Sequence, residues 1–236
     1  MKKSRIATLI VFFVLIPLTL IVGSRLSGRA FYVTSTLVIV ELLIPFFLAF
    51  EGRRPQAREL VVLAVMCALA VAGRVAIPIP SFKAIFGIIM IAGIAFGPES
   101  GFLAGAISAL ASNFFYSQGP YTPWQMMAYG AGGMLAGFVF AEGRLPRKPV
   151  VMGIFGFLAV AFFVGPLLDT CSVFLVMSRI SLKGAMAFYI SGFPVNLRQA
   201  VATAIVLLIL GKPLLEKLDR IKTKYGILDD EGRKEA

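Results

Sequence analysis

The 236-residue sequence contains no histidine, only two cysteines and few charged side chains. Without histidine, the chain lacks the commonest general base and metal ligand. Cys67 and Cys171 lie far apart in apolar segments without metal-ligand spacing, so we predict buried thiols and no metal site. No G-x-x-x-x-G-K-[ST] motif occurs, which excludes ATP hydrolysis by a P-loop. The sequence therefore indicates no catalytic residues, no cofactor and no enzyme.

Charged residues make up only 15% of the chain, whereas hydrophobic residues make up 58%. A soluble domain carries roughly 25% charged residues, so one aqueous core cannot bury this much apolar surface. The apolar runs are long enough to span a bilayer as helices, and strand-like alternation is lacking. We predict an all-α, multi-pass integral membrane protein of the cell (plasma) membrane, with about eight transmembrane helices. They are expected at residues 6–23, 31–50, 59–77, 84–97, 101–116, 124–141, 150–177 and 194–211.

Basic residues outnumber acidic ones by 23 to 12, which gives a formal net charge of +11. Such an excess can indicate a nucleic-acid partner, but its distribution along the chain favours another explanation. With a cytoplasmic N-terminus, sixteen basic residues fall in cytoplasmic segments and six in outer ones, as the positive-inside rule requires. We therefore predict cytoplasmic N- and C-termini, a lipid membrane as the surroundings and no nucleic-acid partner.

The chain divides into three segments at changes in composition. Residues 1–53 are predicted to form a transmembrane hairpin, residues 54–211 a core of six helices, and residues 212–236 a basic cytoplasmic tail. In this tail, the stretch KPLLEKLDRIKTKYGIL places its apolar residues on one side, which predicts a helix at the membrane surface.

The predicted outer connection SQGPYTPWQM contains an unusual mixture of prolines, amides and aromatic rings. Thr122 can cap the following helix, a proline fills its first position, and Gln125 completes a capping box. Such a rigid loop favours preorganised ligand binding. The alternative is an aromatic anchor at the lipid interface. The amides of Asn113, Gln118 and Gln125 favour a ligand, because amides are costly in lipid.

Other polar residues fall within or near predicted spans. Arg74 is expected to be functional or paired, because an arginine inside a span is costly; the alternative is that its side chain extends to the outer surface. Asp169 lies in the outer part of the long 150–177 segment, and Asn196 and Arg198 are expected to begin the last helix after Pro194. Backbone N–H groups at such a helix start favour a polar ligand. The sequence gives no role for Glu41.

Small residues recur at four-residue spacing, which lets helices approach closely. For the glycine pairs Gly93/Gly97, Gly101/Gly105 and Gly133/Gly137, we predict packing within the chain. The alanine stripe Ala64, Ala68 and Ala72 is equally consistent with internal packing and with a docking face for a partner.

The run from FKAIFGIIMIAGIAFGPESGF to QGPYTPWQMMAYGAGGMLAG, with RRPQAREL before it and YISGFPVN after it, resembles the S components of energy-coupling factor (ECF) transporters. The resemblance covers residues 54–211. It implies a six-helix S-component core and a vitamin bound near the outer surface. It also implies docking through the alanine stripe to an ECF transmembrane scaffold subunit with two ATPase subunits. The hinge and RRPQAREL are most similar to the cobalamin-specific group. The sequence departs from that group at position 196, where an acidic residue is expected in place of Asn196.

We therefore predict a substrate-binding S component that captures cobalamin or a related corrinoid. The alternatives are an S component for another vitamin and a structural subunit of a membrane complex. The predicted substrate-binding residues are Arg74, Phe82, Lys83, Asn113, Gln118, Tyr121, Trp124, Gln125, Tyr129, Asp169 and Asn196; the predicted docking residues are Ala64, Ala68 and Ala72.

Overall fold

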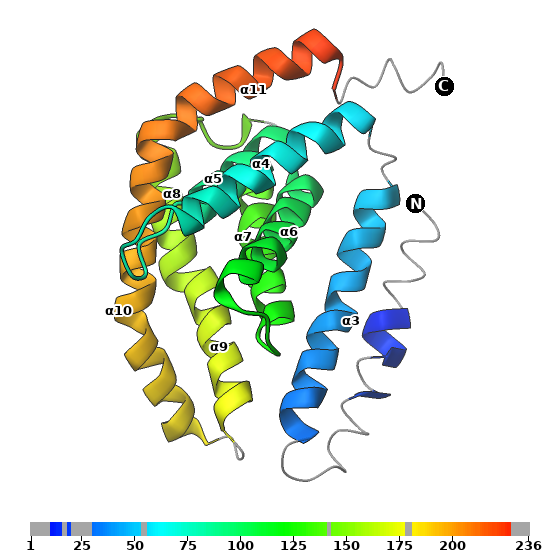
Figure 1. Ribbon diagram of the computed structural model, residues 1–236, viewed down its shortest axis with the longest axis vertical. Coiled ribbons are helices and arrows are strands. Elements are labelled where there is room, and N and C mark those ends of the chain that lie inside the picture. Colours follow the sequence, from blue (N-terminus) through cyan, green and yellow to red (C-terminus); the bar gives the residue numbers. More distant parts are fainter. Residues whose placement is uncertain are drawn as a thin grey trace.

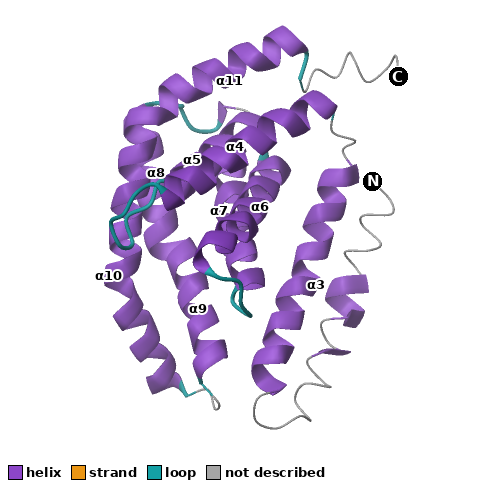
Figure 2. Ribbon diagram, in the orientation of Figure 1, coloured by secondary structure: helices purple, strands orange, loops and turns teal. Residues whose placement is uncertain are grey.

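The computed structural model describes residues 10–15, 18–19, 30–52, 56–140, 143–177 and 181–227, and every regular element in these ranges is a helix (Figures 1 and 2). The predicted all-α class is thus confirmed. The elements are η1 (Val11–Leu15), α3 (Ala30–Gly52), α4 (Ala57–Val75), α5 (Ile85–Phe96), α6 (Pro98–Tyr116), α7 (Thr122–Phe140), α8 (Pro149–Ala159), η3 (Val160–Val164), α9 (Gly165–Val176), α10 (Leu182–Val206), η4 (Leu207–Gly211) and α11 (Lys212–Tyr225).

Among the described residues, two continuous helices are long and apolar enough to cross a membrane, Pro149–Val176 and Leu182–Tyr225. Ile85–Phe96 is a shorter apolar helix. The predicted spans between residues 31 and 141 each fall on one of the helices α3 to α7. The first predicted span, 6–23, lies largely outside the described residues.

The predicted outer connection over residues 178–193 is wrong for most of its length, because α10 already begins at Leu182. Ser181 caps this helix, and its hydroxyl accepts a hydrogen bond of 3.1 Å from the Gly184 N–H. Pro194 lies inside α10, so Asn196 does not begin a helix as predicted. A proline removes one backbone hydrogen bond, but the helix continues where neighbouring helices pack against it.

Both described π-helical segments between long helices end two residues before a proline. Pro166 follows η3, and Pro213 follows η4. A proline ring crowds the carbonyl group four residues before it, and in both cases that carbonyl lies within the π segment. The wider π turn relieves this clash and lets the two long helices continue with a bend.

The core of the bundle is α5, in which every residue is buried. It lies among α4, α6, α7 and α10, and the glycine pairs allow the closest approaches. A Cβ atom on Gly133 of α7 would meet the carbonyl group of Gly101 on α6, and one on Gly137 would lie 2.6 Å from the Pro98 nitrogen. The predicted internal packing of the glycine pairs is confirmed.

Helix α11 lies across one end of the bundle (Figure 1). The predicted helix in the tail is confirmed, but its apolar side faces the protein. Leu215 and Leu218 are buried in the main core cluster, with Leu214 and Ile221 packed beside them. The apolar side of this amphipathic helix therefore packs against the bundle and is not inserted into lipid.

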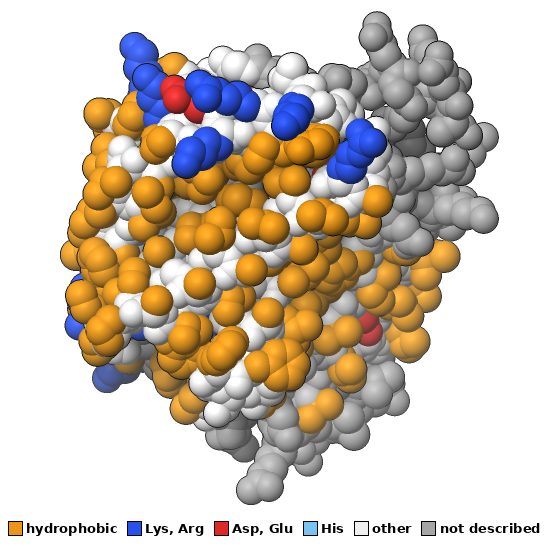
Figure 3. Space-filling view, turned by 45° about the horizontal axis from the view of Figure 1, so that its top comes forward, with side chains coloured by type: hydrophobic (Ala, Val, Ile, Leu, Met, Phe, Trp, Pro, Cys, Tyr) orange, Lys and Arg blue, Asp and Glu red, His pale blue; other side chains and the backbone are white. Residues whose placement is uncertain are grey.

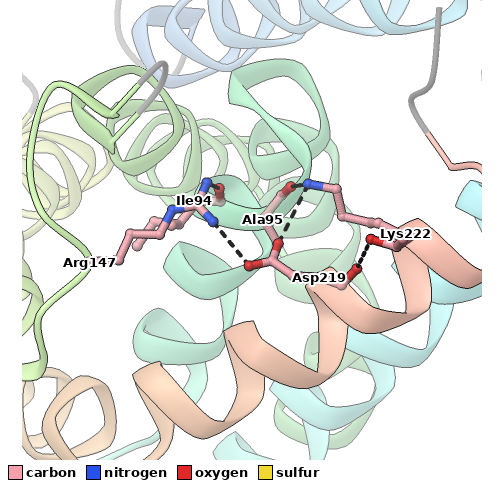
Figure 4. Close-up of polar contacts among 6 residues, drawn as sticks. Ile94, Ala95, Arg147, Asp219 and Lys222 are labelled. Carbon is pink, nitrogen blue, oxygen red and sulfur yellow. Dashed lines mark hydrogen bonds and ion pairs between the residues drawn. The ribbon is translucent and has the colours of Figure 1, made fainter.

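Two cations hold α11 and the α7–α8 connection against the C-terminal end of α5 (Figure 4). Arg147 donates to the Ile94 carbonyl at 3.3 Å, and Lys222 of α11 donates to the Ala95 carbonyl at 2.6 Å. Asp219 lies between them, 3.3 Å from the Arg147 Nη1 and 3.8 Å from the Lys222 Nζ. Burial lowers the pKa of Lys222, and the Asp219 carboxylate opposes this shift. The cations satisfy carbonyl groups that the helix end leaves unpaired.

Candidate ligand-binding site

Asn113 is the centre of a polar network that joins three helices. It lies in the last turn of α6 and is fully buried. Its Oδ1 accepts a hydrogen bond of 2.9 Å from Arg74 of α4. Its Nδ2 donates to the Thr122 hydroxyl at 3.1 Å and to the Gln125 Oε1 at 2.7 Å, both in the first turn of α7. The reversal of the chain between α6 and α7 thus brings two predicted amides into direct contact.

Arg74 is held inside the bundle by neutral groups. Its Nη1 also donates to the Ser112 hydroxyl, and its guanidinium carbon lies 4.9 Å from the Tyr116 ring centre and 5.6 Å from that of Tyr129. Tyr116 donates in turn to the Arg74 carbonyl at 3.0 Å. The aromatic faces stabilise the cation without neutralising its charge. The Arg74 side chain therefore has partners within the bundle, and its role in ligand binding stays a prediction.

The hinge between α6 and α7 is rigid, but not through the predicted capping box. Gln125 turns its side chain to Asn113, and its backbone N–H bonds to the Tyr121 carbonyl at 3.0 Å. The Thr122 hydroxyl instead accepts from the Gly119 N–H at 3.2 Å and donates to Gln118 at 2.9 Å. The capping box fails because the buried Asn113 amide competes for the same side chains.

Trp124 lies on another side of α7, in a small apolar cluster. Its ring stacks on Phe174 of α9 at 5.4 Å between centres, and Ile39 of α3 and Cys171 pack in the same cluster. Tyr121 packs at the edge of this cluster, and its hydroxyl donates to the Ser117 carbonyl at 2.7 Å. Only 8% of Trp124 is exposed, so little of the ring is available to a lipid interface. Its indole N–H is buried without a hydrogen-bond partner within the described ranges.

Asp169 and Asn196 form a second polar pair, between α9 and α10. The Asn196 Nδ2 donates to the Asp169 Oδ2 at 2.7 Å. Glycines make room for both side chains, since a Cβ atom on Gly192 would collide with the Asp169 carboxylate and one on Gly165 with the Asn196 amide. The Thr170 and Tyr189 hydroxyls are 2.8 Å apart beside this pair. These two predicted residues bind each other across the long helices, apart from the Asn113 network.

Phe82 and Lys83 lie in the connection between α4 and α5. The Lys83 ammonium group donates to the Ile77 carbonyl and is 6.0 Å from the Tyr116 ring centre. Gln199 of α10 donates to the Lys83 carbonyl at 2.7 Å. Phe82 is half-buried.

Sequence reasoning missed three members of this site, Ser112, Tyr116 and Gln199. Ser112 and Tyr116 are four residues apart beside Asn113, so helical spacing could have grouped them. The contact of Gln199 spans 116 residues along the chain and has no local signal.

The alanine stripe lies on the outside of the described bundle. Ala64, Ala68 and Ala72 are all exposed, while the opposite side of α4 contributes Leu63, Met66 and Ala70 to the core. Of the two predicted roles, internal packing is therefore wrong within the described part of the chain. Small exposed side chains on a membrane helix permit close approach of another helix.

Metal chemistry finds no support in the described ranges, because no three His, Cys, Asp or Glu side chains gather there. Cys67 and Cys171 are free and buried, as predicted.

Glu41 of α3, for which the sequence indicates no role, has a partner in the structure: its Oε1 accepts a hydrogen bond of 2.5 Å from Thr19.

The fold defines a class: an α-helical membrane protein, with a polar network around the buried Asn113. Comparison with protein families matches residues 55–216 to "ECF-type riboflavin transporter, S component". The match spans more than half of the chain, which therefore belongs to this family. It is an S component, the substrate-binding membrane subunit of an ECF transporter, and not an enzyme. No curated protein and no solved structure matches the chain.

Proposed function

We propose that this S component captures a vitamin at the outer face of the cell membrane, with cobalamin or a related corrinoid as the substrate. The observation that carries the proposal is the polar network around the fully buried Asn113, in which Arg74 lies over the Tyr116 and Tyr129 rings. Polar groups inside a membrane protein are costly, and they usually mark the path or site of a substrate. A separate ECF module, with a transmembrane scaffold subunit and two ATPase subunits, would drive import.

The distribution of charge supports the orientation. The end of the bundle that carries α11 also carries the basic connection before α8, which favours a cytoplasmic location for this end. The α6–α7 hinge then belongs to the outer half. We further propose that residues 1–53 are the N-terminal hairpin, residues 54–211 the S-component core and residues 212–236 the cytoplasmic tail.

Cobalamin is favoured by the likeness of the hinge QGPYTPWQM and of RRPQAREL to the cobalamin-specific group. A corrinoid carries amide groups around a flat ring, which suits a site made of amides, an arginine and aromatic faces. The second candidate is riboflavin, which the name of the matched family favours. A flat heteroaromatic ring with a hydrogen-bonding edge suits the same groups.

Calorimetry on the purified full chain, without nucleotide, tests the proposal with a panel of cobalamin, riboflavin and thiamine. We expect cobalamin to bind without ATP, because the predicted binding residues all lie in this chain and the chain has no P-loop motif. Binding of riboflavin without binding of cobalamin would transfer the function to the second candidate. If none of the vitamins bound to a folded chain, the capture function itself would be wrong.

Arg74→Lys tests whether the network belongs to the site. Lysine keeps the charge, but it lacks the planar guanidinium that lies near the Tyr116 and Tyr129 rings, and its ammonium group holds water more strongly. We expect about a tenfold loss of vitamin affinity, corresponding to roughly 1.4 kcal/mol. Arg198→Lys is the matched control, because Arg198 is exposed on α10 and should leave the affinity unchanged. Equal affinities for both variants would place the network outside the site.

A further inference from the structure

Helix α11 turns a row of cations away from the protein. Lys217, Arg220 and Lys224 are all exposed, and their spacing of three and four residues places them on one side of the helix. Leu215 and Leu218 occupy the opposite side and are buried. We call the row of three cations the basic face.

The basic face has no carboxylate to balance it among the described residues. Asp219 is held by Arg147 and Lys222 on the flank of the helix, and Glu216 lies 3.9 Å from Lys212. Lys217 and Arg220 form no ion pair within the described ranges, and the Lys224 ammonium lies over the neighbouring Tyr225 ring. The charge of the basic face is therefore not balanced by any carboxylate among the described residues, and the face can attract an external anion.

Both ends of α11 adjoin exposed apolar surface. At the N-terminal end, the helix follows Leu208, Ile209 and Leu210 of η4, which are 42%, 65% and 44% exposed. At the C-terminal end, the Tyr225 carbonyl accepts a hydrogen bond of 3.1 Å from Arg58, two residues before the exposed Leu60 of α4. The helix thus follows the edge of the apolar belt, and Figure 3 shows lysine and arginine side chains gathered above a broad hydrophobic surface.

We propose that the basic face of α11 binds the headgroups of anionic phospholipids. In a membrane protein, the edge of the apolar belt lies at the depth of the lipid phosphates, which long basic side chains can reach. The apolar side of α11 is already occupied by the protein core, so the attachment is electrostatic and does not require insertion of the helix. The inference depends on the membrane location and not on the identity of the vitamin.

The test compares two double variants with the same change in charge. Lys217→Gln with Arg220→Gln removes two cations of the basic face; Lys183→Gln with Arg198→Gln removes two exposed cations from α10. Each full-length chain is purified in neutral detergent and titrated with phosphatidylglycerol or phosphatidylcholine, and bound lipid is counted by native mass spectrometry. The thermal midpoint without added lipid checks that each variant is folded.

We expect the wild type to bind phosphatidylglycerol more tightly than phosphatidylcholine. Each cation at the membrane surface contributes about fivefold in affinity, so the α11 variant, which lacks two, should bind phosphatidylglycerol roughly 25-fold more weakly. The α10 variant should match the wild type. Equal affinity for the α11 variant and the wild type, or an equal loss in the α10 variant, would overturn the proposal.

Two further outcomes would identify a different anion. If glycerophosphate alone competed as strongly as the lipid, the basic face would bind free phosphate. If the α11 variant kept its lipid affinity but no longer co-purified with the ECF module, the face would bind an acidic protein surface. Either result would contradict lipid binding, whereas vitamin affinity should remain unchanged in every case.

Discussion

Replacing Gly133 by alanine should destabilise the bundle, because α6 and α7 touch through their backbones at this residue. The added methyl group would meet the Gly101 carbonyl group and the Ile89 Cγ2 atom, with the Gly101 carbon at 2.7 Å. Ordinary contacts begin near 3.4 Å, and the Gly101 oxygen lies closer still than the carbon, so the two helices would have to separate by more than roughly 0.7 Å. A gap of that size loses about a quarter to a half of the dispersion energy of the affected atom pairs.

The size of the effect follows from two opposing contributions. Overpacking in a well-packed core costs about 1–3 kcal/mol, and the rigid backbone partner at Gly133 places it near the upper end. Alanine favours the helix over glycine by up to about 1 kcal/mol. The free energy of unfolding should therefore fall by roughly 2 kcal/mol, which lowers the melting temperature of a chain of this size by about 4–8 °C.

Gly132→Ala is the matched control on the same helix. A methyl group there would come within 3 Å only of the Val164 Cγ2 atom, at the end of a side chain. The gain in helix propensity should offset this contact, leaving the midpoint nearly unchanged. Thermal unfolding of the purified chains in one detergent, followed by circular dichroism, gives both values. Equal midpoints for the two variants would refute the role assigned to backbone contact between α6 and α7.

Three further predictions concern the hinge, the alanine stripe and the contacts of α11. Trp124→Ala should weaken vitamin binding by about ten- to hundredfold if the hinge forms the site. Calorimetry on the folded fraction, with unfolding measured on the same sample, separates a loss of affinity from the loss of packing against Phe174. Unchanged affinity with lowered stability would make Trp124 a packing residue only. Ala68→Trp should abolish co-purification with the ECF module and leave vitamin binding unchanged. The control Ala187→Trp, at an exposed alanine of α10, should leave both unchanged. Normal co-purification of the Ala68 variant would exclude the stripe as the docking face. Lys222→Met should lower the free energy of unfolding by about 1–2 kcal/mol, since it leaves the Ala95 carbonyl unpaired; the exposed Lys217→Met should have no such effect, and equal unfolding midpoints would contradict a structural role for Lys222.

The long helix α10 illustrates where local sequence signals fail. Residues 182–193 mix glycine, serine and a basic residue, and Pro194 follows them, so the segment is typical of a loop before a helix. The chain is nevertheless helical from Leu182, because Ser181 caps it and α9 packs alongside. A proline disfavours a helix locally, but packing between two long helices decides the outcome.

The hinge shows the same limit for a binding site. The composition of residues 117–125 indicated a polar hinge, and the spacing of Thr122 and Gln125 favoured a capping box. The actual partners are set by Asn113 and Arg74, which approach from two other helices. A hydrogen bond between distant segments depends on how helices are placed, which a single sequence does not encode locally.

The sequence by itself determined the helical membrane class and the internal packing of the glycines. Both follow from local properties: apolar length decides whether a helix is stable in lipid, and the lack of a side chain permits contact between backbones. Only the tertiary structure decided that the alanine stripe of α4 lies outside, that Trp124 packs against α3 and α9, and that Asp169 binds Asn196. Which side of a helix becomes buried depends on the helices that surround it, and these are brought together by segments far apart in the chain.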